Sequence, residues 1–552
     1  MSTGTGSLSH VGIGAETAQS RTQPARGSSR SWRRWLRPSL LDVLLVVVPF
    51  WFVGLAHGGL RLLLVDGDTG WHIRTGEWIL QHRAFVRQDL FSFSKAGEPW
   101  FAWEWLSDVI FAWIHGVGGL FWIALFGLAA GAAYCGLVFR HMLWQGARLW
   151  IALPLAFLGF SAATLHLLSR PHMFTLVLVP LAAWWIQADL RRPRWHVWLL
   201  VPLTVLWTNL HGGWLALIAL LGLTAAGLAA EAWLGHRRWT DAGRYGLLTL
   251  ACVAASLVNP YGWRLHEHTL AYLRADYIRN IVGEFRAPSF RGEPMLHYEV
   301  VLLAACAICG LLLVRKQVVA ALWILFWAHA SLQSARHIPL FAAVALPFLG
   351  AELQRLWDGW AARQERRSTA AALDGIASDM QPELTRLTWW PTAVFALALA
   401  GVLPLPAIAD FPKERFPVEM VGRHAPMLRE ARILTQDQWA DYLIYRLYPD
   451  VRVYFDGRSD FYGREIALEY VDTLNGRHDW RQVLDRHRFD VVLLPPGVAL
   501  ASLLKISPDW EILGDDGTAV LFRRRHRGPS RLQQAAGIER SIFLPPPPNE
   551  IP

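Results

Sequence analysis

Long apolar segments alternate with short polar ones from about residue 40 to about residue 408. Runs such as 215–230 and 300–314 contain no charged residue and approach the length that a helix needs to cross a hydrocarbon core of roughly 30 Å. The pattern therefore predicts an α-helical polytopic membrane protein. We expect about eleven spanning helices, at 40–57, 119–139, 149–167, 172–188, 196–210, 213–233, 245–258, 299–314, 318–333, 337–352 and 389–408.

Two apolar segments near the start are predicted to lie on the membrane surface instead. If the segment 104–118 crossed the membrane, the basic segment 191–194 would fall outside, against the usual placement of Arg and Lys in inner loops. We therefore interpret 104–118 as an interfacial amphipathic helix, and 70–82 as a second one. Its apolar side chains are available to lie against lipid: Trp71, Ile73, Trp78 and Ile79.

Basic clusters set the expected orientation. Six arginines precede the first span and predict that the N-terminus is inside: Arg21, Arg26, Arg30, Arg33, Arg34 and Arg37. Alternation then places the other inner segments, each with basic residues, at 140–148, 191–194, 236–244, 315–316 and 353–388. Residues 1–38 are expected to form a disordered cytoplasmic tail, and 39–409 a transmembrane domain whose first outer loop is 58–118.

The pattern changes after the last apolar segment, which ends outside. Residues 410–525 carry more charge, and short strand-like and helix-like runs alternate there. We predict a small extracytoplasmic α/β domain, followed by a disordered tail at 526–552. The expected strands are 432–434, 451–455, 490–494 and 518–522, the expected helix is 438–447, and 515–517 is a hairpin turn.

Composition agrees with a membrane protein and argues against a nucleic-acid-binding one. Of the 552 residues, 53% are hydrophobic and 18% are charged, and the 30 tryptophans gather near the ends of the apolar runs, as interfacial anchors do. The net charge of +9 is distributed as orientation signals between apolar segments, so we predict no nucleic-acid partner. No disulfide is expected, because the cysteines all lie in apolar segments: Cys135, Cys252, Cys306 and Cys309.

Polar motifs gather in the predicted outer loops, which indicates one cavity at that membrane face. The first loop begins with Asp66 and Asp68, two carboxylates close enough to bind one divalent cation such as Mg²⁺ or Mn²⁺. Alternatively one of them acts as a base while the other stays ionised. A solvated acidic loop that helps to fix the topology is an equally good interpretation of the pair alone.

Later outer loops supply cations and imidazoles that suit a phosphate or diphosphate group. Arg170 and His172 stand together before one span, His211 follows another, and Arg336 and His337 stand where a span ends outside. The alternatives are structural: a capping arginine in a turn before a proline, a tight turn between two spans, and an arginine that extends to the interface.

The C-terminal domain contains one charged cluster after a predicted strand. Asp456 and Arg458 either bind an acceptor on a loop at the strand's end or pair with each other to fix a turn. No Gly-rich phosphate loop, nucleophile elbow or zinc-ligand spacing is present in the sequence.

This arrangement resembles the GT-C superfamily of membrane glycosyltransferases, which use polyprenyl-phosphate-linked sugars. The resemblance covers the architecture of about residues 40–408 and one motif: Asp68 and Thr69 followed by Trp71 and His72, where many members have an Asp-Glu pair. It implies that Asp68 is a base or a metal ligand and that later Arg and His residues hold the lipid phosphate. Thr69 departs from the pattern: either Asp66 substitutes for the missing acid and makes an Asp-x-Asp motif, or the use of a metal differs from that of the family.

The sequence therefore predicts a bacterial inner-membrane transferase that moves a sugar from a polyprenyl-phosphate donor to an extracytoplasmic acceptor. Two other functions stay open at this point. One is a transporter or flippase of a lipid-linked glycan, although no internal repeat supports it. The other is a non-catalytic envelope scaffold whose outer domain binds a partner.

Overall fold

The computed structural model describes residues 39–41, 59–291, 293–365, 368–386 and 408–525. The predicted tails at 1–38 and 526–552 lie outside the described residues. The predicted spans 40–57 and 389–408 do so as well, apart from their terminal residues 40, 41 and 408.

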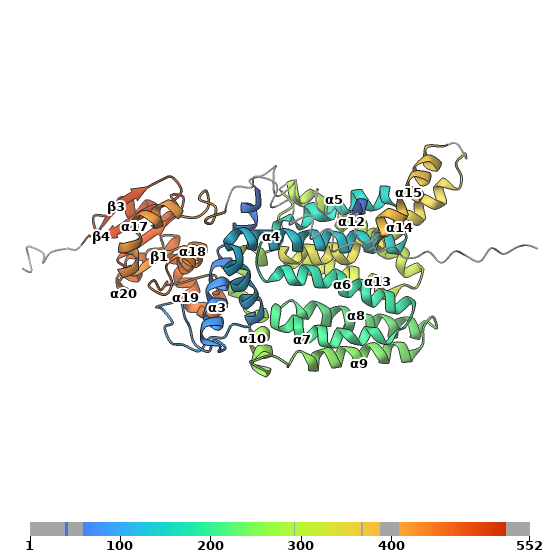
Figure 1. Cartoon of the computed structure of the whole chain (residues 1–552), viewed down its shortest axis with the longest axis horizontal. Coiled ribbons are helices and arrows are strands. Elements are labelled where there is room, and N and C mark those ends of the chain that lie inside the picture. Colours follow the sequence, from blue (N-terminus) through green and yellow to red (C-terminus); the bar gives the residue numbers. More distant parts are fainter. Residues whose placement is uncertain (1–38, 42–58, 292, 366–367, 387–407, 526–552) are drawn as a thin grey trace, which may run out of the picture.

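Most of the described chain is a bundle of apolar helices, with a small domain at one end of it (Figure 1). Five helices in this part are long and apolar enough to cross a membrane: α4 (Trp105–Gln145), α6 (His172–Arg191), α8 (Trp214–Trp233), α12 (Glu293–Val314) and α14 (Ile338–Ala361). Shorter helices lie among them: α5 (Leu149–Ala163), α7 (Leu200–Leu210), α9 (Trp239–Ala255) and α13 (Val318–Gln333). Each predicted span from 119 to 352 thus falls on a helix, while the number that crosses a membrane stays a prediction.

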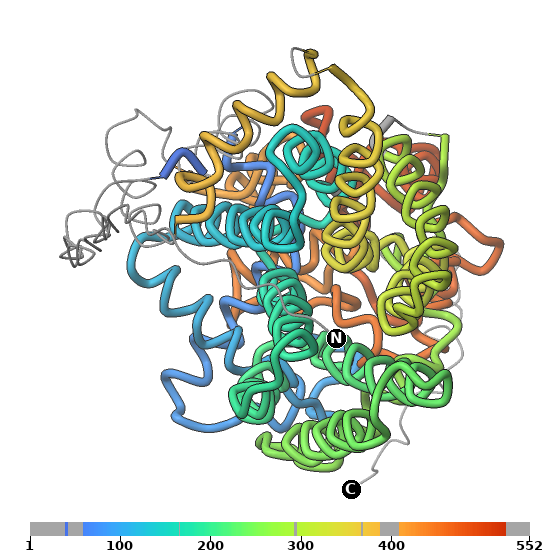
Figure 2. Tube along the Cα trace, turned by 90° about the vertical axis from the view of Figure 1, so that its right-hand side faces the viewer, coloured from blue at the N-terminus to red at the C-terminus, as the bar shows by residue number. Residues whose placement is uncertain are grey.

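Figure 2 views the bundle from the end opposite the small domain, which lies behind the helices. The elements that join or flank the bundle are η2 (Gly59–Leu64), α10 (Trp263–Arg274), α11 (Asp276–Ile281) and α15 (Thr369–Thr385). All four cysteines lie in bundle helices as free thiols.

Helix α4 consists of two helices separated by a backbone break. Gly118 and Gly119 have non-helical dihedral angles, and φ of Gly119 is +65°, a conformation that glycine adopts without a Cβ penalty. The break falls where the sequence predicts that the segment 104–118 ends and the span 119–139 begins. The location of 104–118 at a membrane surface stays a prediction.

The prediction for the segment 70–82 is correct in part. It forms helix α3 (Asp68–His82), but the side chains expected to face lipid are covered by protein: Trp71, Ile73 and Ile79 are buried and Trp78 packs against the core. Helix α3 lies between α4 on one side and α18 (Asp437–Leu447) of the small domain on the other. An amphipathic pattern shows that one face is covered, not whether lipid or protein covers it.

The small C-terminal domain is built on a mixed four-stranded sheet, in the order β1-β2-β4-β3. Its strands are β1 (Ile433–Thr435), β2 (Val491–Leu494), β3 (Trp510–Asp515) and β4 (Val520–Arg524). β1 runs parallel to β2, and the hairpin of β3 and β4 closes at the predicted turn, with β4 antiparallel to β2. Around the sheet lie α17 (Val418–Glu430), α18, α19 (Ser459–Leu474), α20 (Trp480–Arg486) and α21 (Ala499–Lys505).

The strand predicted at 451–455 is wrong. This segment forms only isolated bridges, from Val453 to Ile433 and to Ser92. The Val453 carbonyl accepts from the N–H of Phe93, and its own N–H donates to the Phe91 carbonyl, both at 2.9 Å. The segment 91–93, which belongs to the predicted first outer loop, is therefore the hydrogen-bonding partner of this segment.

Glycines on α3 allow close contact with the helices on both sides. A Cβ on Gly67 would lie 2.2 Å from the Gln438 carbonyl oxygen, and one on Gly70 would lie 2.7 Å from that of Asp441. On the opposite side, a Cβ on Gly76 would lie 1.9 Å from the Asp108 carbonyl oxygen. Side chains at these positions would push α3 away from the backbones it contacts.

We therefore expect Gly76→Ala to lower the free energy of unfolding of the detergent-solubilised protein by about 2–3 kcal/mol, because the added methyl group overpacks the α3–α4 contact. Gly116→Ala is the matched control: Gly116 is helical, and no atom lies within 4 Å of a Cβ there. The control should be neutral or slightly stabilising. Equal stability of the two variants would contradict the close contact.

Candidate functional site

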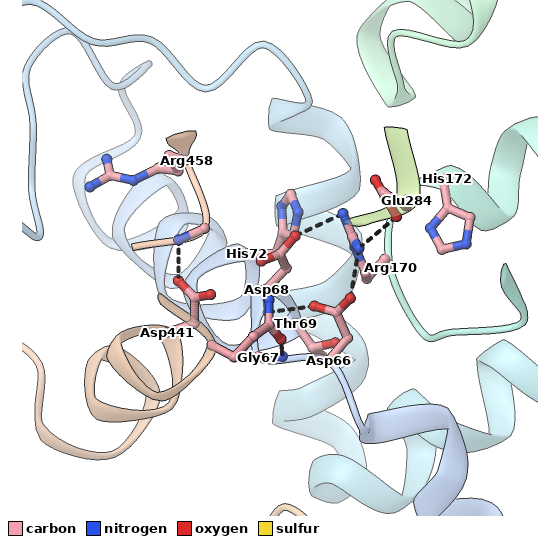
Figure 3. Close-up of polar contacts among 12 residues, drawn as sticks. Asp66, Gly67, Asp68, Thr69, His72, Arg170, His172, Glu284, Asp441 and Arg458 are labelled. Carbon is pink, nitrogen blue, oxygen red and sulfur yellow. Dashed lines mark hydrogen bonds and ion pairs between the residues drawn. The ribbon is translucent and has the colours of Figure 1, made fainter. Parts of the chain in front are cut away.

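Three of the predicted site residues meet at the end of the bundle that faces the C-terminal domain. The Arg170 guanidinium lies between two carboxylates, with Nη1 2.6 Å from Asp66 Oδ2 and Nη2 2.7 Å from Asp68 Oδ2 (Figure 3). A third acid, Glu284, lies 3.5 Å from Nη1. Arg170, predicted to hold a phosphate, is thus engaged by carboxylates in this structure.

Asp68 is held at the first turn of α3. Its N–H donates to Asp66 Oδ1 at 3.0 Å, so the two acids are fixed relative to each other. The following residue, Thr69, donates its hydroxyl to the Ser169 carbonyl at 2.9 Å and joins the first loop to the loop that carries Arg170. The Asp68 side chain is buried, and its Oδ1 has no hydrogen-bond partner in the described structure.

A second carboxyl group faces that atom from the C-terminal domain. Asp441 on α18 is fully buried, and its Oδ1 accepts the N–H of Gly457 at 3.0 Å, while its Oδ2 has no hydrogen-bond partner among the described residues. A Cβ on Gly457 would lie 2.2 Å from Asp68 Oδ1 and 2.8 Å from Asp441 Oδ2. The two unpartnered oxygens therefore approach the same point beside the Gly457 backbone.

Burial dominates the acidity of this pair. It raises the pKa of Asp68 to about 7, although the neighbouring Arg170 charge acts in the opposite direction. Burial, followed by the Asp68 charge, raises the pKa of Asp441 well above its usual range. A hydrogen bond between the two carboxyl groups requires a proton on one of them, because two carboxylates are both acceptors. Burial therefore disfavours the ionisation of both carboxyl groups at once.

A chain of acids and imidazoles extends from Asp68 into the bundle. His72 lies one helical turn after Asp68; its Nδ1 is 2.6 Å from Asp108 Oδ1, and its Nε2 is 3.8 Å from Glu104 Oε2. On the other side of Glu104, the Nε2 of His211 lies 3.5 Å from Oε1. The series Asp108, His72, Glu104 and His211 thus connects α4, α3 and the end of α7.

Burial disfavours the charged form of both imidazoles in this chain. The Nδ1 of His211 accepts the N–H of Gly213 at 2.9 Å, so its proton is on Nε2, which faces Glu104. Burial, together with Arg336, lowers the pKa of His211 well below its usual range, and burial together with Arg170 does the same for His72. Burial also raises the pKa of Glu104 to about 8, so these contacts join neutral groups at pH 7.

The remaining predicted residues lie around Glu284. Arg336 Nη1 is 3.8 Å from Glu284 Oε1, and its guanidinium stacks on Phe285 at 4.4 Å. The Nε2 of His172 is 2.7 Å from the His166 carbonyl oxygen, and its ring lies 6.5 Å from that of His211. His337 has its Nδ1 3.2 Å from the Ala330 carbonyl oxygen at the turn between α13 and α14.

Glu284 is the acid that joins the two arginines. Burial raises its pKa, but Arg170 and Arg336 outweigh burial and hold it well below its usual range. Sequence reasoning missed Glu284 because it lies in a short 3₁₀ turn, η5 (Gly283–Phe285), with no apolar periodicity around it. It missed Asp441 because a single acid within a helix carries no motif.

The Asp456–Arg458 cluster has a structural role. Arg458 Nη2 is 2.6 Å from Asp456 Oδ2 and 2.8 Å from Asp89 Oδ1, and all three side chains are buried. The Arg458 side chain points away from Asp68 and Arg170 (Figure 3). Of the two interpretations of this cluster, the ion pair that fixes a turn is therefore the one that the geometry favours.

A divalent cation on Asp66 and Asp68 stays a prediction. In the part of the chain that the structure describes, no group of three or more His, Cys, Asp or Glu side chains has an arrangement that would hold a metal ion. The Arg170 guanidinium occupies the position between the two carboxylates and already balances their charge. A bridging cation would have to displace it.

Comparison with known proteins adds no relative to this description. No protein-family model matches the chain, and no curated protein matches it. The resemblance to the GT-C superfamily is therefore an expectation from the sequence. The function has to be argued from the geometry of the site.

Proposed function

We propose that the chain is a membrane glycosyltransferase of the bacterial inner membrane, which moves a sugar from a polyprenyl-phosphate donor to an extracytoplasmic acceptor. One observation supports it above the others: Asp68 combines a buried, unpartnered carboxyl oxygen with a pKa of about 7, at the end of an apolar bundle beside the C-terminal domain. A carboxyl group of that acidity is suited to accept a proton near neutral pH.

The proposed reaction forms a bond between the acceptor oxygen and the anomeric carbon of the sugar. The bond between that carbon and the donor's phosphate oxygen breaks, and the electron pair leaves with the phosphate. Asp68 takes the proton of the acceptor hydroxyl. In this scheme Arg170 orients Asp68 and Asp66 and balances their charge, because its contacts are already to both carboxylates.

The leaving phosphate is assigned to Arg336, with His172 and His211 near it. The only described acid paired with Arg336 is Glu284, at 3.8 Å, which is looser than the contacts of Arg170. An arginine presents paired N–H donors to phosphate oxygens and stabilises the charge that develops as the bond breaks. Burial lowers the pKa of His211 well below its usual range, so this imidazole adds a neutral N–H donor at Nε2. The N–H of His172 donates to the His166 carbonyl, so His172 helps to shape the site.

The acceptor is assigned to the side of Asp68 that faces the C-terminal domain. Asp441 and the backbone of Gly457 lie there, and the rest of the cluster lies towards the bundle. In the proposed reaction a lipid-linked donor approaches the cluster from the bundle side, and the acceptor approaches it from the side of the C-terminal domain.

Asp68→Asn should abolish sugar transfer, because an amide cannot accept the proton; we expect a loss of at least about 100-fold. The measurement is mass spectrometry of envelope glycans and polyprenyl-linked sugars in a deletion strain complemented with each variant. Asp472→Asn is the control, an exposed acid paired with Arg477 at 3.1 Å. The Asp68 variant should accumulate the lipid-linked donor and lack one sugar on the acceptor.

If Asp68→Asn, present in the membrane at the wild-type level, restores the wild-type glycan profile, Asp68 is not the base and the transferase is excluded in this form. Accumulation of the lipid-linked sugar on the inner leaflet alone would favour the flippase. These outcomes are distinguishable by treating intact cells with a membrane-impermeant reagent that labels the outer-leaflet sugar.

The protonation of Asp68 predicts a pH profile. A base must be ionised, and the pKa of Asp68 is raised to about 7, so activity should rise with pH through about 7 and level off above it. The charged groups that face Asp68 are Asp66, Arg170, Glu284 and Asp441. Infrared titration of the protonated carboxyl band provides the measurement, with Asp68→Asn as the reference.

Arg170→Gln should move that titration to higher pH, because the Arg170 charge favours the ionised form of Asp68. The assignment would be contradicted if the wild type has no carboxyl band that titrates near pH 7 and disappears in Asp68→Asn.

A further inference from the structure

A second polar feature lies at the end of the bundle away from the C-terminal domain. Helix α6 begins at His172 beside the candidate site and ends at Arg191; its 20 residues span roughly 30 Å. A pocket of about 610 Å³ opens at this far end. Its lining includes Trp144, Trp185, Arg191, Arg192, Arg194 and His196.

The pocket carries positive charge that no acid balances. Its lining includes one acid, Asp189, whose Oδ2 lies 2.8 Å from Arg244 Nη1 and accepts the Tyr245 hydroxyl at 2.9 Å. Asp189 Oδ1 accepts from Arg244 and from the N–H of Arg194. This acid is buried and fully engaged, and no salt bridge to the arginines at 191, 192 and 194 occurs among the described residues.

The shape of the pocket is fixed by these same contacts. Asp189 holds the backbone of the loop at Arg194, and Arg191 stacks on the Trp144 ring with its guanidinium carbon 3.8 Å from the ring centroid. Arg191 also donates to Gln145 and to the Trp144 carbonyl. Arg192 and Arg194 are exposed and line the same pocket, where their guanidinium groups can reach an anion.

Tryptophans surround the arginines on the same face. Trp195 is 67% exposed, and it stands between two basic residues in the sequence, Arg194 and His196. An exposed Trp beside arginines is the composition found at the headgroup level of a membrane, where the indole ring lies at the interface and the guanidinium contacts phosphate. A soluble phosphate compound would not explain the exposed indole.

We propose that this pocket binds the phosphate group of an anionic phospholipid, with Arg192 and Arg194 as its main ligands and Arg191 at its base. The three arginines point to a phosphate ligand, and the exposed Trp195 points to a lipid as its source. The site is separate from the cluster around Asp68 and does not depend on the proposed transferase activity.

The test uses the full-length protein in lipid nanodiscs of phosphatidylcholine that contain increasing amounts of phosphatidylglycerol. The midpoint of thermal unfolding is measured at each lipid composition. Phosphatidylglycerol should raise the midpoint of the wild type. In the double variant Arg192→Gln with Arg194→Gln, the concentration of phosphatidylglycerol needed for half of that rise should increase about 25-fold. This value assumes that each arginine near the surface contributes about five-fold to lipid affinity.

The matched control is Arg238→Gln with Arg363→Gln, which removes the same charge from exposed positions that do not line the pocket. It should shift the titration much less than the pocket variant does, because these arginines lie outside the pocket. Three results would overturn the proposal: no rise with phosphatidylglycerol, an equal loss in the control, or equal protection by inorganic phosphate in phosphatidylcholine discs. The last would show that the ligand is a soluble phosphate.

Discussion

The candidate site depends on one buried cation, the guanidinium of Arg170. It contacts Asp66 and Asp68 from the first outer loop and Glu284 from a loop more than one hundred residues further along the chain. Buried carboxylates repel one another and lose hydration, so these acids are stable together only while a positive charge lies between them. Arg170 therefore holds three loops in one arrangement and leaves Asp68 with one free oxygen. That arrangement, rather than any single motif, defines the candidate site at the end of the bundle.

Helix α3 connects the Arg170 cluster to both α4 and the C-terminal domain. It begins at Asp68, contacts α18 through Gly67 and Gly70, and contacts α4 through Gly76. The C-terminal domain is consequently part of the site: it brings Asp441 to the unpartnered oxygen of Asp68, and the N–H of Gly67 donates to Gln438 at 2.6 Å. Helix α3 therefore provides the contact between the bundle and the C-terminal domain.

The sequence predicted the elements better than their partners. Apolar length identifies the bundle helices. The positions of Asp68 and Arg170 at the ends of apolar runs predicted that they share one site, and the structure brings the two side chains together. The pattern could not reveal Asp441, because pairing between residues 68 and 441 depends on how two domains pack. It also assigned Trp71 to lipid, since a helix buried between two protein surfaces has the same amphipathic pattern as one on a membrane. The segment at 451–455 has a strand-like sequence, but its hydrogen-bonding partner is the first outer loop instead of a full neighbouring strand.

A double-mutant cycle between Asp66 and Arg170 tests most directly whether the buried cation organises the site. The free energy of unfolding of the detergent-solubilised protein would be measured for Asp66→Asn, Arg170→Gln and the double variant. If the guanidinium compensates the buried carboxylates, the double variant loses less stability than the sum of the single ones, with a coupling energy of about 1–3 kcal/mol. Additivity within about 0.5 kcal/mol would show that the two groups do not depend on each other, and would contradict the account.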